Sequence, residues 1–225
     1  ALWPFATLGW PKKTKDLKEF YPTDVLSTAR DIINLWVARM VFSALEFTKK
    51  IPFKIVYIHP TVLTVEGKRM SKSLGVGIDP LELIEKYGAD ATRFGIAWQL
   101  TGAQDIRFSE DHIIAGRKFC NKVWNASRFV ILQTATAKCK MQNAKLKLKI
   151  QNLTPSDRKA LKALKGIVES ANKDLENFRF GQALQKIYHF FWHDFCDKYI
   201  EQSKKQLQTP NSKLQTIKVL LYVLL

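Results

Sequence analysis

Two short hydrophobic segments lie in the first quarter of the chain, separated by a stretch with helical spacing. Residues 23–27, "TDVLS", and 53–59, "FKIVYIH", are rich in β-branched and aromatic side chains, which predicts two short buried strands. Between them, apolar side chains recur every three or four residues and predict a helix to about Phe47, which Thr28 could cap. The recurring side chains are Ile32, Leu35, Trp36 and Met40. This order indicates a βαβ unit and a parallel sheet.

The pattern becomes helical after residue 78, whereas residues 3–22 are rich in Pro, Gly and Lys and predict irregular structure. Asp79 followed by Pro80 is a typical helix start, and Gly88 is a typical stop. Further helices are predicted from Asp90, from Ser109 to about Leu132, from Thr154, and from about Gln182 to Gln202. The expected fold class is therefore α/β followed by all-α, with a helical bundle in the second half and a basic connector at residues 135–153.

For two of these helices the spacing predicts which residues share one face. One side of the helix from Ser109 is predicted to carry Cys120, Val123, Trp124, Ser127 and Val130. The last helix has apolar residues at helical spacing, namely Leu184, Ile187, Tyr188, Phe191 and Phe195. It also carries His189, His193 and Cys196 on one face, a spacing compatible with a metal site. No fourth ligand is evident and the segment has the pattern of a bundle core, so we expect no protein-bound metal.

The net charge of +16 is concentrated in the second half of the 225 residues. Residues 1–110 hold 15 basic and 12 acidic side chains, and residues 111–225 hold 21 and 8. A nearly neutral half joined to a strongly basic half favours a reaction domain plus a domain that binds a polyanion. Nucleic acid fits better than a membrane, because no long basic amphipathic helix is present and the closing "VLLYVLL" is too short to span a bilayer.

The cysteines indicate the redox compartment of the protein, and the two ends of the sequence indicate whether it is part of a longer protein. Three cysteines without a CxxC pair favour a reducing compartment over a disulfide framework or a zinc ribbon. No signal peptide is visible. The sequence begins with Ala1 inside the aromatic run "ALWPF" and ends in an apolar segment. We interpret it as a fragment of a longer protein.

The stretch that carries the most chemistry is "GKRMSKSLGVGIDP", residues 67–80. In it Lys72 lies between Ser71 and Ser73 and is framed by glycines. A Walker phosphate loop is excluded because GxxxxGK[ST] is absent. A lysine beside hydroxyl and backbone N–H groups could still hold a polyphosphate and release it. The alternative interpretation is a flexible, solvated surface loop.

Several segments resemble one family. "RMSKS", residues 69–73, is similar to the KMSKS signature of class I aminoacyl-tRNA synthetases and departs from it only at Arg69. The following "LGVGIDPLELIEKYGADATRF" is similar to the same region of the valine, isoleucine and leucine enzymes, and "DIINLWVARM" and "ALWPFATLGWP" resemble the valine enzymes. "GAQDIRFSE", "GRKFCNKVWNASRFV" and "FFWHDFCDKYIEQSK" fit the same family. The resemblance covers the whole chain and thins at 135–153.

The resemblance implies a fold and a reaction. Residues 1–110 would be the second half of a Rossmann-like catalytic domain, 111–153 a connecting helix and linker, and 154–225 an anticodon-binding helical domain. The reaction would be activation of L-valine by ATP, with Mg²⁺, and transfer to tRNA(Val), by a monomer in the cytoplasm. The HIGH element and the editing domain would lie upstream of Ala1, so the isolated fragment is expected to be inactive.

The resemblance also implies roles for residues of the catalytic half. Lys72, flanked by Ser71 and Ser73, would neutralise charge on the departing pyrophosphate. The residues expected at ATP are Arg69, Met70, Lys72 and Asp31. Asp31 occupies the position of a family GxD element whose glycine is Ala29 here; alternatively, it is a first-turn acid favoured by the helix dipole.

The remaining implied sites are a pocket and an RNA surface. Ile32 and Trp36 match positions that line the valine pocket, although plain core packing explains them almost as well. The residues expected to bind tRNA are Arg117, Lys118, Lys122 and Arg128, and the alternative is a solvated face. Two other functions stay open, a fragment of an isoleucyl-tRNA synthetase and a non-catalytic tRNA-binding protein derived from a synthetase.

Overall fold

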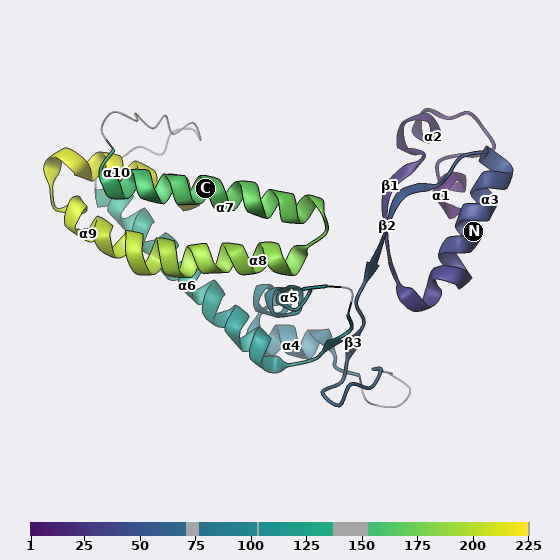
Figure 1. Cartoon of the computed structure of the whole chain (residues 1–225), viewed down its shortest axis with the longest axis horizontal. Coiled ribbons are helices and arrows are strands. Elements are labelled where there is room, and N and C mark those ends of the chain that lie inside the picture. Colours follow the sequence, from purple (N-terminus) through teal and green to yellow (C-terminus); the bar gives the residue numbers. More distant parts are fainter. Residues whose placement is uncertain (71–76, 103, 137–152, 225) are drawn as a thin grey trace. The chain divides into compact units, whose positions relative to one another are not determined.

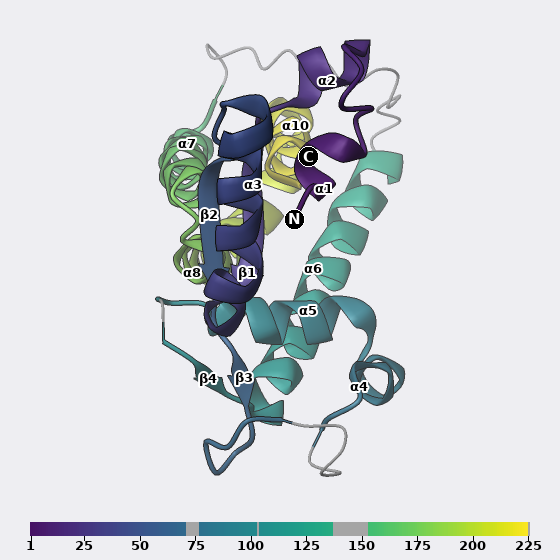
Figure 2. The same cartoon turned by 90° about the vertical axis from the view of Figure 1, so that its right-hand side faces the viewer.

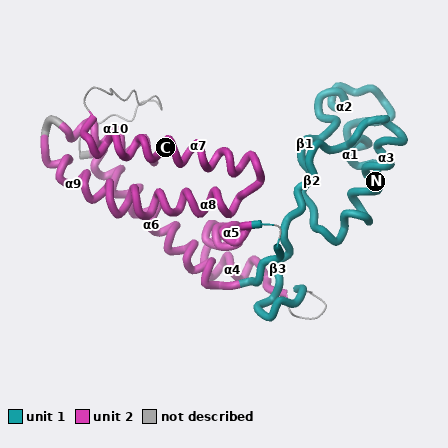
Figure 3. Tube along the Cα trace, in the orientation of Figure 1, with its two compact units in different colours: residues 1–76, 102–108 teal, residues 77–101, 109–225 magenta. Residues whose placement is uncertain are grey.

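The computed structural model describes residues 1–70, 77–102, 104–136 and 153–224 (Figure 1). The chain divides into two compact units, which Figure 3 shows in two colours. The first comprises residues 1–76 and 102–108, and the second comprises residues 77–101 and 109–225. None of the helices in the described ranges is long and apolar enough to cross a bilayer.

The first unit is built around two parallel strands. Its elements are α1 (Trp3–Ala6), α2 (Lys15–Phe20), β1 (Thr23–Ala29), the 3-10 turn η1 (Arg30–Ile32), the π-helical turn η2 (Ile33–Val37), α3 (Ala38–Thr48), β2 (Phe53–His59), β3 (Val62–Leu63) and β4 (Ile106–Arg107). Val25 of β1 pairs with Ile55 of β2, and Ala29 pairs with His59. The predicted βαβ unit is therefore confirmed, and Figure 2 shows β1, α3 and β2 side by side. A second pair joins β3 to β4, also in parallel.

The start of the predicted helix is wrong. Thr28 does not cap a helix, because it lies in β1 opposite Ile58 and is only 2% exposed. Its β-branched side chain suits the strand, and strand pairing continues through Ala29 before the chain turns. The regular helix begins only at Ala38, after η1 and η2. Ile32 and Trp36 therefore lie in two irregular turns rather than on one α-helical face.

The packing of the strands also differs from the prediction. Met40 and Val37 pack with Phe53 in a small core, against which Leu26 rests. Side chains that alternate to the other face of the sheet, such as Val25 and Ile55, are exposed. Residues 3–22 are less irregular than predicted. They form α1 and α2, and the Thr14 hydroxyl caps α2 by accepting from the Leu17 amide at 3.1 Å.

The second unit is helical. Its elements are α4 (Pro80–Tyr87), α5 (Ala89–Trp98), α6 (Glu110–Thr136), α7 (Pro155–Glu176), α8 (Phe180–His189), the π-helical segment η4 (Phe190–Ile200), α9 (Glu201–Leu207) and α10 (Pro210–Leu224). Its core comprises Ala126, Val130, Leu153, Phe190, Phe195, Cys196, Tyr199, Ile200, Leu207, Ile217, Val219, Leu220 and Leu221. These residues come from α6, η4, α9 and α10, and Leu153 lies just before α7, so one apolar core joins these helices, as the bundle prediction required.

Helix starts in this unit follow the predicted signals. The Asp79 carboxylate accepts from the Leu81 amide at 2.9 Å. At α7, the Thr154 hydroxyl accepts from the Asp157 amide at 3.2 Å, while the Asp157 carboxylate accepts from the Thr154 amide at 3.0 Å. This is a reciprocal capping box. Several bounds differ slightly. α5 begins at Ala89 rather than Asp90, and α6 extends to Thr136 rather than Leu132. The helix predicted from Gln182 to Gln202 runs from Phe180 to Leu207, through α8, η4 and α9.

Two predicted helix faces need correction. Trp124 of α6 is 72% exposed, whereas Phe119, Ala126 and Val130 are buried. Trp124 is rotated by roughly 120–160° from these three buried residues at 3.6 residues per turn, so it cannot share that face. In the helix from α8 to α9, the π-helical turns of η4 shift the inward face. Ile187 of α8, which precedes this segment, is exposed, while Phe195 within it is buried.

Candidate functional site

The carboxyl ends of β1 and β2 meet at one edge of the sheet. Ala29 and His59 are the last paired residues, and the chain continues from them into Arg30 and Pro60. In parallel α/β sheets this is the edge where ligands bind. The Lys72 loop, which follows β3 in sequence, is expected near this edge, but it lies outside the described residues.

Two ion pairs join separate segments at this edge. Arg69 pairs with Asp31, 38 residues earlier in the chain. A guanidinium nitrogen of Arg30 lies 3.9 Å from a carboxylate oxygen of Asp105, which also accepts from the Thr61 amide at 2.9 Å. Exposed pairs of this kind add little stability. These pairs matter because they bring two cations and two carboxylates together at the strand ends. Asp105 was not anticipated, since its sequence position gave no signal.

A tight turn delivers the chain to Arg69. The Gly67 amide donates to the Thr64 carbonyl at 2.9 Å, the Thr64 amide donates to the Lys68 carbonyl at 2.8 Å, and Leu63 and Arg69 form an antiparallel bridge. Gly67 has a φ of +81°, and a Cβ there would meet the Arg107 guanidinium at 3.2 Å. Both observations favour glycine at this position.

The other residues expected at ATP are only partly described. Met70 follows Arg69 and is half-buried. Ser71, Lys72 and Ser73 lie outside the described residues. The structure thus brings Arg69 and Asp31 together, and the roles of all these residues at ATP stay predictions.

An apolar hollow of about 390 Å³ lies in the first unit next to Trp36. Its volume is within the range of small-molecule sites. Besides Trp36, its lining includes Trp3, Val25, Leu26, Met40 and Phe53. Ile32 does not line it and is 40% exposed. Trp3 was missed by the sequence reasoning; its only signal was its place in the aromatic "ALWPF".

The four cations expected to bind tRNA lie on α6 but differ in their surroundings. Arg117, Lys118 and Arg128 are exposed. The Lys122 ammonium instead donates to the Asp197 carboxylate at 2.9 Å and lies 4.9 Å from the centre of the Trp192 ring. The hydrogen bond to Asp197 raises the pKa of Lys122. Lys122 is therefore engaged by η4, and the other three are available to a ligand.

His189, His193 and Cys196 do not converge on a common point. The imidazoles are exposed and approach acids instead, with His193 Nδ1 3.3 Å from the Asp197 carboxylate. The Cys196 thiol is in the core, where burial raises its pKa to about 11. In the described residues, no group of three or more His, Cys, Asp or Glu side chains could hold a metal.

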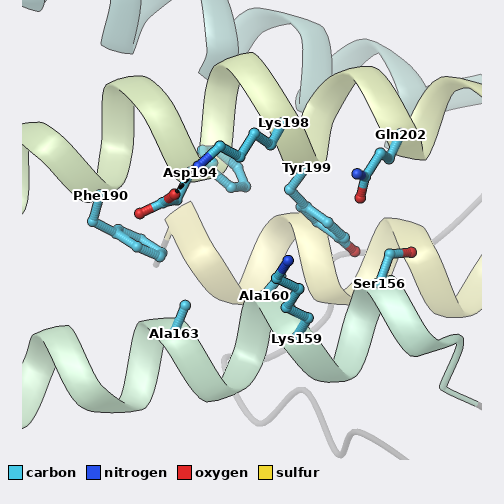
Figure 4. Close-up of a pocket in the computed structure, with 10 residues that line it drawn as sticks. Ser156, Lys159, Ala160, Ala163, Phe190, Asp194, Lys198, Tyr199 and Gln202 are labelled. Atoms are coloured by element: carbon cyan, nitrogen blue, oxygen red, sulfur yellow. Dashed lines mark hydrogen bonds and ion pairs between the residues drawn. The ribbon is translucent and has the colours of Figure 1, made fainter.

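Another hollow lies between α7 and η4 (Figure 4). It is lined by Lys159, Ala163, Phe190, Tyr199 and neighbouring residues, and the Lys198 ammonium closes one side by donating to Asp194 at 2.8 Å. Its volume is about 90 Å³. That is well below the size of ordinary ligand sites, so we attribute it to imperfect helix packing.

Comparison with known families decides the relationship. The family "tRNA synthetases class I (I, L, M and V)" matches residues 1–109, and the family "Anticodon-binding domain of tRNA ligase" matches residues 157–225. The chain belongs to the class I tRNA synthetases. The predicted loop, the βαβ unit and the helical second half all lie within or between the two matched regions.

Individual synthetases extend the similarity over the whole chain. A valine–tRNA ligase of Clostridium tetani is 50% identical over 227 residues, covering 100% of this chain and 25% of that protein. A valine–tRNA ligase of Thermotoga maritima is 47% identical over 220 residues, covering 97% of this chain and 24% of that protein. The chain thus spans about a quarter of the length of these relatives.

A solved synthetase has the same fold. The LeuRS–tRNA–LeuAMS ternary complex of Agrobacterium radiobacter K84 matches with a TM-score of 0.77 at 19% identity, over 99% of this chain and 28% of that one. The predicted fold class is therefore confirmed. The compact units divide the chain differently from the predicted domains, because residues 77–101 group with the helices. The domain boundaries at 110 and 153 stay a prediction.

Proposed function

We propose that this chain is part of a valine–tRNA ligase, which activates L-valine with ATP and transfers it to tRNA(Val). One observation carries the choice of valine. Valine–tRNA ligases match essentially the whole chain at 47–50% identity, across both the strand edge and the helices. The isoleucine alternative has no comparable support.

The strand edge supplies the adenylate chemistry in this proposal. The valine carboxylate attacks the α-phosphorus of ATP, pyrophosphate leaves, and the positive charges of Arg69 and Lys72 offset the negative charge that builds on the leaving group. Ser71, Ser73 and Met70 contribute to the same loop, and Mg²⁺ enters with ATP as part of the substrate. The pairing of Arg69 with Asp31 supports the proposal, because it holds the beginning of the loop at the strand ends.

The amino-acid site in this proposal is the hollow beside Trp36, with Ile32 at its margin. An indole and aliphatic side chains suit the branched side chain of valine, whose recognition needs apolar contact and little else. The lining by Val25, Leu26 and Met40 supports this choice. Such a pocket would reject an added hydroxyl group poorly, as general experience with hydrophobic pockets shows.

The helical unit supplies tRNA binding in this proposal, chiefly through Arg117, Lys118 and Arg128 on α6, with Lys122 contributing only where its Asp197 contact opens. The charge excess after residue 110 supports this role. We further propose a monomer that works in the cytoplasm. Cys120 and Cys196 are both free thiols, which fits a reducing compartment.

A chimera tests the proposal directly. Residues 1–225 would replace the matching quarter of the Clostridium tetani ligase, and ATP–pyrophosphate exchange would be measured with valine, isoleucine and threonine. We expect exchange with valine at a rate within about tenfold of the parent, and weak exchange with isoleucine.

Each failure has its own meaning. A preference for isoleucine would support the isoleucyl alternative. A folded chimera that binds tRNA without any exchange would support the non-catalytic alternative. The molecular mass of the same preparation, measured by analytical ultracentrifugation, tests whether the protein is a monomer.

A further inference from the structure

One side of α6 is exposed along its length and carries an unusual mixture of side chains. Successive members are three or four residues apart, so they form one stripe about 80° wide. The stripe consists of Arg117, Asn121, Trp124, Arg128 and Ile131, all of them exposed. Trp124 lies in its middle and is 72% exposed. An indole is large and apolar, so leaving it in water costs free energy that a bound partner would recover.

The charge around Trp124 has one sign. Between residues 112 and 136, α6 contains four basic residues and no acidic one. Arg117 and Arg128 lie on the stripe, Lys118 is exposed beside it, and the fourth, Lys122, is turned toward Asp197. Neither Arg117 nor Arg128 forms an ion pair with a residue in the part of the chain that the structure describes. The two guanidinium groups are therefore available to anions on either side of Trp124.

This combination fits single-stranded nucleic acid better than a protein partner. A protein-covered helix face presents a continuous apolar stripe, whereas here Trp124 has Asn121 and Arg128 as its neighbours one turn away on each side. Two cations with an aromatic ring between them suit a single RNA strand, because the phosphates can contact the cations while an unpaired base stacks on the ring. Arg117 and Arg128 are 11 residues apart, about 16 Å along the helix. That spacing leaves room for at least one nucleotide over Trp124.

We propose that Trp124 is a stacking residue for an unpaired base of bound tRNA, with Arg117 and Arg128 contacting phosphates on either side of that base. The inference rests on the proposed function, to which it adds a recognition element outside the basic residues. Trp124 positions the tRNA and takes no part in adenylate formation. Its contribution is apolar, so it differs from that of the arginines in its dependence on salt.

Salt titration separates these contributions. The affinity of the 225-residue chain for tRNA(Val) would be measured by filter binding at several salt concentrations, with circular dichroism as the check on folding. Trp124→Ala is expected to weaken binding by about 5- to 100-fold at every salt concentration, leaving the salt slope unchanged. Trp124→Phe should retain most of the affinity because it keeps an aromatic face. Arg117→Gln should lower the slope by about 1.

Ile131→Ala provides the matched control, because Ile131 is another exposed apolar residue of the same stripe. We expect it to bind tRNA as the unaltered chain does. Equal losses for Ile131→Ala and Trp124→Ala would show that general apolar contact, and not stacking of a base on the indole, supports binding, and would overturn the inference. A loss of the helical circular dichroism signal in Trp124→Ala would show that Trp124 supports the fold, and would also overturn the inference. If the chain binds tRNA and Trp124→Ala binds equally well, only this inference fails; if the unaltered chain binds no tRNA, the proposed function fails as well.

Discussion

The two units of the chain are stabilised to very different degrees. The second unit has a core of thirteen buried residues, a reciprocal cap at the start of α7 and a buried hydrogen bond from the Tyr199 hydroxyl to Asp157 at 2.7 Å. In the described residues of the first unit, two clusters have three buried residues each, and several strand side chains face solvent. Burial of apolar area is the main source of stability. We therefore expect the first unit to unfold first, although it carries the residues proposed for chemistry.

The largest effect should come from Met40, which is 1% exposed in the smaller core. Met40→Ala removes buried methylene groups and leaves a cavity, which should cost about 3 kcal/mol. A unit with so small a core should then lose its fixed structure in buffer, while the helical unit remains folded. Urea unfolding followed by far-ultraviolet circular dichroism, with limited proteolysis to locate the open segment, checks this. A single transition shifted as a whole would mean that the two units unfold together and that the contrast is wrong.

A smaller effect is expected at Asp157 in the helical unit. Asp157→Ala removes one half of the α7 capping box and leaves the Tyr199 hydroxyl without its acceptor, at a cost of about 2 kcal/mol. The urea midpoint of the second transition should fall while the first is unchanged. Asp194→Ala is the control, because its exposed i, i+4 pair with Lys198 should contribute less than about 0.5 kcal/mol. Equal shifts for the two variants would contradict a special role for the buried acid.

The smallest effect concerns the turn between α7 and α8, where the buried Asp174 pairs with Lys186 and Arg179. The hydrogen bond from Lys186 is the main cause that lowers the pKa of Asp174 below its usual value. A lowered folded-state pKa adds stability above the unfolded-state pKa, near 4, that is lost as the pH falls through the folded value. Unfolding midpoints at pH 6 and pH 3 should therefore differ more in the unaltered chain than in Asp174→Asn. An equal pH dependence of the unfolding midpoint in the unaltered chain and in Asp174→Asn would show that Asp174 does not contribute to it.

Local signals in the sequence predicted much of the fold. Pro80 after Asp79 and the Thr154–Asp157 capping box act within one turn, so their effect can be read directly from neighbouring residues. Thr28 was misassigned because a β-branched hydroxyl residue suits both a strand and a cap. The choice depended on its pairing with Ile58, which is 30 residues away.

Residues of the candidate site could be predicted from the sequence where they belong to a short motif. Contacts between residues that are distant in the sequence could not. The "RMSKS" stretch indicated Arg69, but its pairing with Asp31 depends on the sheet edge. Lys122 and Arg117 are equivalent as basic residues of one helix. Only the fold turns Lys122 toward Asp197, 75 residues away, and leaves Arg117 exposed.

In the proposed function the strand edge and the Lys72 loop activate valine, and a Lys72 variant of the chimera tests this step. Valine-dependent ATP–pyrophosphate exchange would be compared between the chimera and its Lys72→Ala variant. Because the ammonium group acts on charge that develops in the transition state, we expect a loss in rate of about 100- to 1000-fold, with the valine concentration for half-maximal rate nearly unchanged. Exchange at an unchanged rate by Lys72→Ala would contradict the account.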